Sequence, residues 1–289
     1  GKEIKLKVRS VKFAIIIFLF NLMLGIIAIT GFELMFNMHL NPYVDYSGAA
    51  KVFYILISME IIAVMFLVPA FTAGSIAGER EKQTLDILLT TVLTPEKIVM
   101  GKLLSSVSMV LLLVVSSLPV ISIVFTIGGV GMEDLVQFML AILVISFFIG
   151  SMGMLASTVL KKTVPAMVCS MVEVMLVCVG TVIIIGVTYI IAKLYYYNYM
   201  GAVGNMPDVS GACLVLLVNP VFTVIQMTME QCESVSAISK LAEILNGSVP
   251  VFIEDNWFKI SMVSQVVITI ILLKMSAFFL KPIKNIHIQ

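Results

Sequence analysis

Charged side chains are scarce in this sequence. Only 12% of the 289 residues are Asp, Glu, Lys or Arg, whereas a soluble domain carries about 25%. Hydrophobic residues make up 60% of the chain, and the mean hydropathy is +1.12. Because so little polar surface is available to cover a core, the composition excludes a soluble globular enzyme, a disordered chain and a nucleic-acid-binding protein with a basic face.

The sequence also lacks a nucleotide-binding motif. A phosphate-binding loop reads Gly-x-x-x-x-Gly-Lys followed by Ser or Thr. The nearest match, Gly101-Lys102, is followed by Leu103, and Glu96 stands in the place of the first glycine. We therefore expect no ATP site within this chain.

Residues suited to metal binding or disulfide bonding are few. The spans assigned below place the two histidines, His39 and His287, on opposite sides of a membrane, so we expect no zinc site built on paired histidines. Four cysteines in a chain of this length are too few for a disulfide framework. The spacing leaves open whether Cys213 and Cys232 pair. We expect neither a metal site nor a resident cofactor.

Long apolar runs are what the sequence has in abundance. A helix needs about 20 mostly apolar residues to cross the hydrocarbon core of a membrane. Six runs meet this length and are apolar on every face, as expected for helices in lipid; they are Phe13–Phe32, Val52–Ala73, Leu103–Ile127, Leu135–Thr158, Val164–Ala192 and Trp257–Leu280. They predict an all-α membrane protein with six transmembrane helices.

A seventh apolar run, Gly211–Met229, is interrupted by Asn219-Pro220. Proline removes a backbone donor and clashes with the preceding helical turn. The run is therefore either a distorted seventh span or a pair of short helices that enters and leaves on the same side. The distribution of charge distinguishes the two.

Basic residues are distributed unequally between the two sides that six spans define. Basic residues are retained on the cytoplasmic side of a membrane. Most of the 18 Lys and Arg residues fall on the side of the termini, and the other side holds only Lys51, Lys193, Lys240 and Lys259. We therefore predict cytoplasmic termini. A seventh span would move Lys281 and Lys284 outside, so we interpret Gly211–Met229 as an outer re-entrant element within a large extracellular loop, 193–256.

The inner segment 74–102, between the second and third spans, carries the most concentrated charge. Glu79–Lys82 is followed by the amphipathic stretch Leu85–Leu89, and Thr94-Pro95 predicts a helix start. We expect two short helices along the inner face before the third span begins. Helices of this kind rest on lipid or dock a partner protein, and the pattern alone leaves both possibilities open.

This segment resembles the signature loop of type-2 ATP-binding-cassette exporter permeases. The resemblance rests on Ala77-Gly78-Glu79-Arg80-Glu81, Thr84-Leu85-Asp86-Ile87-Leu88-Leu89, Thr94-Pro95, Ile98 and Gly101-Lys102. The order of the spans and the Asn219-Pro220 pair before the last span are similar to that family as well. One departure is Lys82-Gln83, where a glycine is common in the family.

The resemblance implies that residues 1–289 form a single permease domain, energised by a separate ATPase subunit that binds ATP and magnesium. In the family, a coupling helix in this inner segment sits in a groove of the ATPase. By resemblance, the docking candidates are Glu79, Arg80, Glu81, Thr84, Leu85 and Asp86. A second copy of the chain, or a homologous permease, is a further implied partner.

Two carboxylates interrupt the apolar interior, Glu60 in the second span and Glu173 in the fifth. A charge at mid-bilayer costs at least about 2.5–3.5 kcal/mol, so it usually faces a cavity or a partner. Our hypothesis is that both line a translocation route and favour cationic groups on the cargo. The alternative is a structural carboxyl bonded to a neighbouring hydroxyl; Ser170 lies one turn from Glu173.

Small residues at helical spacing indicate close helix packing. They occur at Gly150-Ser151-Met152-Gly153 and at Gly74 with Gly78. We expect both groups to lie against neighbouring helices.

Together these features favour the permease subunit of an ATP-driven exporter in the plasma membrane, with membrane lipid and a transported substrate as further partners and no nucleic acid. An ion- or proton-coupled secondary transporter or channel that uses Glu60 and Glu173 is an alternative. A membrane signalling scaffold is another. The class of substrate is left open by the sequence.

Overall fold

The computed structural model describes residues 10–35, 47–85, 94–127, 131–198, 206–233 and 235–280. All regular secondary structure in these ranges is helical, which confirms the all-α part of the predicted fold class. Six of the described helices are long and apolar enough to cross a membrane. They are α2 (Val11–Met35), α3 (Ser47–Glu81), α5 (Pro95–Ile127), α6 (Met132–Val159), α7 (Thr163–Asn198) and α11 (Trp257–Leu280).

Each predicted span lies within one of these helices. α3 and α5 extend well beyond the predicted spans: α3 continues past Ala73 to Glu81, and α5 begins at Pro95, as Thr94-Pro95 predicted. Hydropathy marks only the part of a helix that is apolar enough for hydrocarbon. Backbone hydrogen bonding continues past that limit into polar sequence.

The inner segment 74–102 differs from the expectation of two short helices, because its first part continues α3 as one helix. That helix ends at Glu81, and two residues later Gln83 has a φ of 57°. The N–H of Gln83 donates to the carbonyl of Arg80 (3.1 Å), and the N–H of Thr84 donates to that of Glu79 (2.9 Å). This is a Schellman ending, which favours glycine at the left-handed position. The rest of the expected coupling helix, from Asp86 on, lies outside the described residues.

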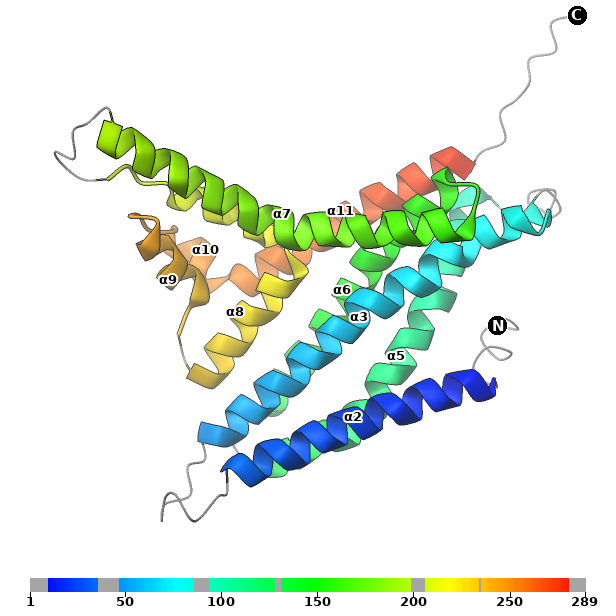
Figure 1. The fold of residues 1–289 in the computed structure, drawn as a ribbon, viewed down its shortest axis with the longest axis horizontal. Helices are drawn as coiled ribbons and strands as arrows, with labels where there is room; N and C mark the ends of the chain where they lie inside the picture. The colour runs from blue at the N-terminus through cyan, green and yellow to red at the C-terminus, as the bar shows by residue number, and fades with distance from the viewer. Residues whose placement is uncertain are drawn as a thin grey trace, which may run out of the picture.

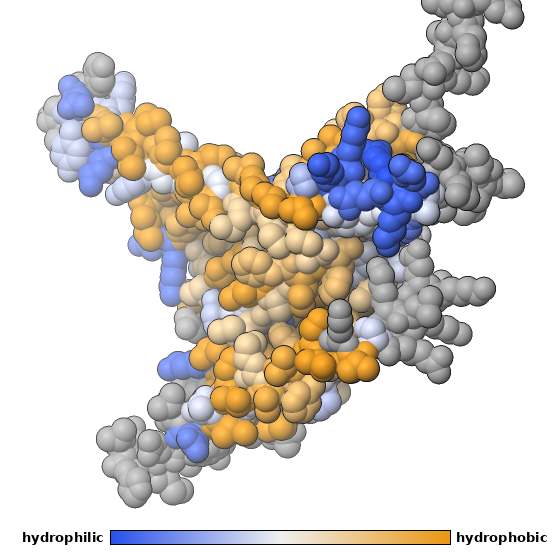
Figure 2. All heavy atoms as spheres, turned by 45° about the vertical axis from the view of Figure 1, so that its right-hand side comes forward, coloured by the Kyte–Doolittle hydropathy of each residue, from blue (hydrophilic) through white to orange (hydrophobic). Residues whose placement is uncertain are grey.

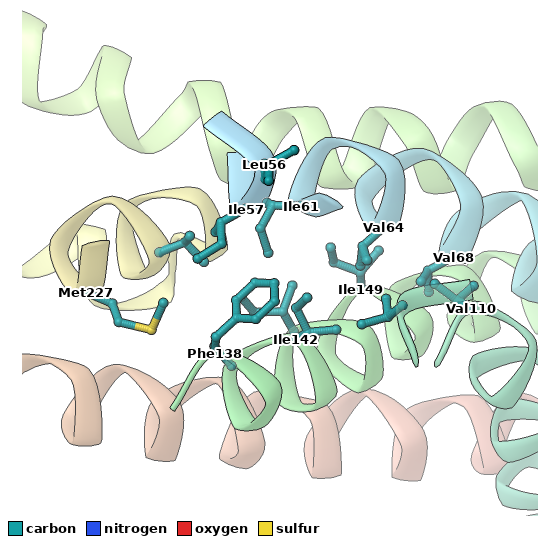
Figure 3. Packing of buried hydrophobic residues seen from close by; sticks show 14 of the residues in the cluster. Leu56, Ile57, Ile61, Val64, Val68, Val110, Phe138, Ile142, Ile149 and Met227 are labelled. Atoms are coloured by element: carbon teal, nitrogen blue, oxygen red, sulfur yellow. The ribbon is translucent and has the colours of Figure 1, made fainter. Parts of the chain in front are cut away.

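α6 lies at the centre of the bundle and packs against α3, α5, α7 and α11, while α2 packs on α3 and α5 at the edge (Figure 1). Figure 3 shows the central contact, in which Ile57, Ile61 and Val64 of α3 face Phe138 and Ile142 of α6. All five side chains are almost fully buried. This apolar packing fixes α3 against the helix that contacts most of the others.

Glycines on α6 allow this close approach. A Cβ at Gly153 would lie 2.0 Å from Oγ1 of Thr72 on α3, and one at Gly150 would lie 2.7 Å from Cδ1 of Leu103 on α5. The predicted packing role of Gly150–Gly153 is confirmed. Of the second pair, Gly78 lies near Thr163, but a Cβ at Gly74 would meet no atom within 4 Å, so the expectation that Gly74 packs against a helix is wrong.

The element before the last span is bent at Asn219, as the sequence predicted. The 3-10 helix η1 (Ser210–Val218) and α8 (Pro220–Glu233) meet there at 106°. Oδ1 of Asn219 accepts from the N–H groups of Val221 and Phe222, which caps α8. Its amide nitrogen donates to the Cys178 carbonyl (2.9 Å) and to Oγ1 of Thr181 (2.7 Å) on α7. Asn219 thus starts α8 and attaches it to α7.

Two short helices, α9 (Ala237–Ile244) and α10 (Val251–Asp255), complete the bent element. Trp257 is buried among side chains of η1 and α9, beside the free thiol of Cys213. The side chain of Cys232 lies outside the described residues. At the start of η1, the Ser210 N–H donates to Asp208 (2.8 Å) and lowers the pKa of that carboxyl.

Polar and apolar side chains are segregated on the surface. In Figure 2, apolar side chains cover the flanks of the long helices, and hydrophilic side chains gather at the helix ends. We name one of these ends the basic end: it is the end at which α3, α6 and α11 finish and α5 and α7 begin (Figure 1). Its described basic residues include Arg80, Lys82, Lys97, Lys102, Lys161 and Lys162.

Candidate functional site

The basic end contains most of the candidate residues and is held together by a buried apolar cluster. The cluster draws on α3, α5, α6, α11 and the chain after α3; its members are Ile76, Leu85, Ile98, Val99, Leu103, Val107, Met154, Ala277 and Leu280. Leu85 is only 7% exposed. This docking candidate therefore anchors the chain after α3 to the bundle.

Glu79 joins α3 to α5. Its Oε1 lies 2.9 Å from the ammonium of Lys102 on α5, and its other oxygen accepts from the hydroxyl of Thr84. Thr84 is thereby held one turn beyond the end of the helix, at the Schellman ending. Two of the docking candidates, Glu79 and Thr84, thus contact each other, and Glu79 also contacts α5.

Arg80 binds the end of α6. Its guanidinium donates to the carbonyl of Thr158 (3.1 Å) and to that of Leu160 (3.4 Å). Carbonyls in the last turn of a helix have no intrahelical partner and carry partial negative charge. A cation at this place supplies the missing donors and interacts favourably with the helix dipole.

Glu81 binds the beginning of α7. Its carboxylate accepts from the N–H of Thr163 (3.1 Å) and from the hydroxyl of the same residue (2.9 Å). The N–H groups of a first helical turn have no intrahelical acceptor and carry partial positive charge. Adjacent residues of α3 therefore hold both sides of the short α6–α7 turn, which contains the exposed Lys161 and Lys162.

Ser157 adds a link that the sequence did not reveal. Its Oγ accepts from the N–H groups of Ile76 and Ala77, both at 2.9 Å, so α6 is bonded to the backbone of α3 itself. Sequence reasoning also missed the pairing of Glu81 with Thr163 and of Glu79 with Lys102. Thr163 and Lys102 are both far from α3 in the chain, and no local spacing signals the pairing.

The first intramembrane carboxyl, Glu60, is 0% exposed and is directed toward α5. One of its oxygens accepts from the hydroxyl of Ser117, and the other has no hydrogen-bond partner among the described residues. The same hydroxyl also has the Val114 carbonyl within hydrogen-bond distance (2.7 Å). Glu60 thus has the hydroxyl neighbour that the structural alternative requires.

The second carboxyl, Glu173, is half-buried on α7. Its contact is the thiol of Cys169 at 3.7 Å on the same helix, while Ser170 donates to the Met167 carbonyl instead. The expected Ser170 partner is therefore wrong for Glu173. Its second oxygen has no hydrogen-bond partner within the described ranges.

The described groups at the basic end form hydrogen bonds and an ion pair between helices. In the part of the chain that the structure describes, no group of three or more His, Cys, Asp and Glu side chains is placed to hold a metal ion. Asp86, the remaining docking candidate, lies outside the described residues.

Comparison with known proteins identifies the family of this chain. No curated protein matches this chain. The family model described as ABC-2 family transporter protein matches residues 1–281, nearly the whole chain. This agrees with the six apolar helices and with the resemblance carried by the inner segment, and it implies a membrane permease subunit of an ABC transporter. The chain therefore belongs to the ABC-2 family of transporter proteins.

Proposed function

We propose that this permease exports a substrate from the cytoplasm and is driven by a separate ATPase subunit that docks at the basic end. The basic end would face the cytoplasm of a cell whose plasma membrane contains the protein, because the charge asymmetry favours that orientation. ATP and magnesium would be bound by the ATPase. Two permease chains, identical or homologous, would form the complete channel with two ATPases.

The observation that carries this proposal is the pair of contacts made by Arg80 and Glu81. A push on the inner segment that moves the end of α3 would also move the end of α6 and the beginning of α7, since each is bonded to it. Through Glu79 the same displacement would reach α5. A movement of this one loop on docking would therefore shift α3, α5, α6 and α7 together.

The docking candidates would then have two tasks. Glu79, Arg80, Glu81 and Thr84 form hydrogen bonds within the chain, and Leu85 is buried. Their contribution would be to position the segment and to transmit its movement. The exposed side chains beside them, together with Asp86, would contact the ATPase directly.

The experiment is purification of the tagged full chain from its native membranes, followed by reconstitution of the recovered complex in liposomes. We expect a retained ATP-binding-cassette ATPase, and Glu81→Gln should lower permease-stimulated ATP hydrolysis and transport. Glu96→Gln is the matched control, because Glu96 is an exposed acidic residue at the same end. Loss of every ATPase on purification, together with unchanged transport by Glu81→Gln and Glu79→Gln, would contradict the proposal.

Within this mechanism we propose that Glu173 lines the translocation route and favours cationic cargo. It is half-buried on α7, one of its oxygens has no partner among the described residues, and much of that helix is exposed in the single chain. Glu60 is the weaker candidate for a route-lining role, since it is fully buried between α3 and α5. Export of a cationic substrate by Glu173→Gln and by the Glu60→Gln/Glu173→Gln double variant tests both roles.

The same unpartnered oxygens favour one other function, ion- or proton-coupled transport. A carboxyl within a membrane that has a free acceptor is suited to binding a proton or cation. Such a transporter would respond to a proton or sodium gradient in liposomes without ATP. Gradient-driven uptake that Glu60→Gln or Glu173→Gln abolishes would support it over the exporter. Transport in neither assay would leave a signalling scaffold as the remaining proposal.

A further inference from the structure

A groove with a volume of about 470 Å³ lies between the second half of α3 and the first turns of α5. Small residues of α3, Gly74, Ser75 and Gly78, form one wall, and a Cβ at Gly74 would meet no atom within 4 Å. Elsewhere α3 is packed tightly, as at Thr72 against Gly153. The space beside Gly74 therefore belongs to a defined opening on one side of α3.

The two ends of the groove differ in chemistry. Ala70 and Phe71 line one end, where the hydroxyl of Ser106 on α5 donates to the Phe71 carbonyl (3.2 Å). Lys82 and Lys102 line the other, at the basic end. From Ala70 to Lys82 the chain rises about 18 Å, which is close to one leaflet of a hydrocarbon core about 30 Å thick. The groove would thus be lined mainly by small and apolar residues at membrane depth and by two lysines at the level of the headgroups.

The ionisable side chains that line the groove are two lysines and one carboxylate, that of Glu79. The Glu79 carboxylate lies 2.9 Å from the Lys102 ammonium and offsets part of the positive charge. Lys82 is exposed and forms no ion pair with any other described residue. Ser105, beside Lys102 in the wall, has a buried hydroxyl oxygen with no hydrogen-bond partner in the described part of the chain. An anion at the mouth would therefore find two ammonium groups, with a hydroxyl nearby.

We propose that this groove binds a phospholipid with an anionic headgroup. Its phosphate would lie between Lys82 and Lys102, and one acyl chain would run along Gly74 toward Ala70. A free phosphate would satisfy the ammonium groups but would leave the apolar half of the groove empty. A bound lipid would contact α3 and α5 at once, so the lipid composition of the membrane would influence the spacing of these helices. This proposal does not depend on the direction or the energy source of transport.

The test uses the full chain reconstituted in vesicles with equal amounts of phosphatidylglycerol and phosphatidylcholine of matched acyl chains. After extraction in mild detergent, native mass spectrometry counts the phospholipid of each class that stays bound. We expect preferential retention of phosphatidylglycerol, and we expect Lys82→Gln to lower the ratio of the two lipids about fivefold. Gly74→Leu, which fills the apolar half, should lower retention of both lipids.

Matched controls distinguish a specific lipid site from general effects of surface charge and side-chain size. Lys97→Gln removes an exposed lysine at the same end that does not line the groove, and Gly186→Leu enlarges an exposed glycine on α7 with open space around it; both should leave retention unchanged. Equal retention of the two lipids by the unaltered chain would overturn the proposal. An equal effect of Lys97→Gln and Lys82→Gln on retention would overturn it as well. Release of the lipid by added inorganic phosphate would also overturn it, because it would identify a simple phosphate site.

Discussion

The carboxylate of Glu81, on the last turn of α3, accepts hydrogen bonds from both the N–H and the hydroxyl of Thr163, the first residue of α7. A side chain of one transmembrane helix thus caps the beginning of another. The preceding residue, Arg80, binds the carbonyls at the end of α6. Charge of each sign is placed where the helix dipole favours it, so the α6–α7 turn is fixed to α3 by complementary contacts.

The first prediction concerns this cap. Glu81→Gln keeps the size of the side chain but removes the charge that interacts with the first turn of α7, so we expect a loss of about 0.5–1 kcal/mol in the free energy of unfolding. The midpoint of thermal unfolding of the purified chain in detergent measures it. Thr163→Val, which removes the hydroxyl and keeps the N–H, should cost less. An unfolding midpoint for Glu81→Gln equal to that of Glu96→Gln would show that the contact contributes nothing.

A second prediction concerns the left-handed residue that ends α3. Gln83 has φ of 57°, a conformation that costs about 1–2 kcal/mol for a residue with a Cβ and little for glycine. Gln83→Gly should therefore stabilise the protein by about 1 kcal/mol in thermal unfolding. Lys82→Gly is the matched control, because the Lys82 N–H continues the regular helical bonding to Gly78 and a glycine there only adds flexibility. Stabilisation by both variants would contradict the conformational argument.

Gln83 also shows what the sequence could and could not predict. The six spans followed from apolar length, the start of α5 from Thr94-Pro95, and the bend before the last span from Asn219-Pro220. Each is a local property of the chain. The sequence shows that Lys82-Gln83 stands where the family commonly has a glycine. That this glycine position is the left-handed residue of a helix end could be recognised only once the structure showed that α3 continues to this point.

The contacts within the candidate site could not be predicted from the sequence, for a different reason. Glu79, Arg80 and Glu81 were identified as one charged group, yet each binds a different helix: α5, α6 or α7. Which helix each reaches depends on the rotation of α3 and on how closely α6 approaches it at Gly153. The same holds for Glu60, whose neighbour Ser117 lies on α5 and could not be found from helical spacing on α3.

The third prediction tests the close approach of α3 and α6. Gly153→Ala would place a Cβ 2.0 Å from the Thr72 hydroxyl and 3.0 Å from its Cβ. The helices would have to separate, and we expect a loss of about 1–3 kcal/mol in the free energy of unfolding, as for other overpacked cores. Gly180→Ala is the control, since a Cβ there meets no atom within 4 Å. Equal unfolding midpoints for the two variants would rule out the steric argument.

The fourth prediction separates the two tasks of Asn219. Asn219→Asp retains an oxygen that can accept from Val221 and Phe222 but loses the donor to Cys178 and Thr181 on α7. We expect it to lower the unfolding midpoint while hydrogen exchange at Val221 and Phe222 stays slow. Asn219→Ala should lose both contacts, with a cost of about 2–4 kcal/mol, and exchange at these amides should accelerate.

A comparison residue for this pair of variants is Asn256, whose side-chain amide donates, among the described residues, only to the exposed Phe252 carbonyl. Asn256→Ala should change neither the unfolding midpoint nor exchange in α8. If Asn219→Asp accelerated exchange in α8 as strongly as Asn219→Ala, the capping role of the side-chain oxygen would be wrong.

The last prediction concerns Glu60 and the single hydrogen of the Ser117 hydroxyl. That hydroxyl has two acceptors within reach, Glu60 and the Val114 carbonyl, so a side chain at position 60 that can donate as well as accept fits the site. Glu60→Gln meets this requirement at nearly the same size, and we expect a change of less than about 1 kcal/mol in the free energy of unfolding. Glu60→Ala leaves a cavity and should cost about 2–4 kcal/mol. Thermal unfolding of both variants in detergent, read beside transport in liposomes, distinguishes the roles. A Glu60→Gln variant that keeps its stability and its transport assigns Glu60 to helix packing, whereas one that keeps stability and loses transport assigns it to the route of the cargo.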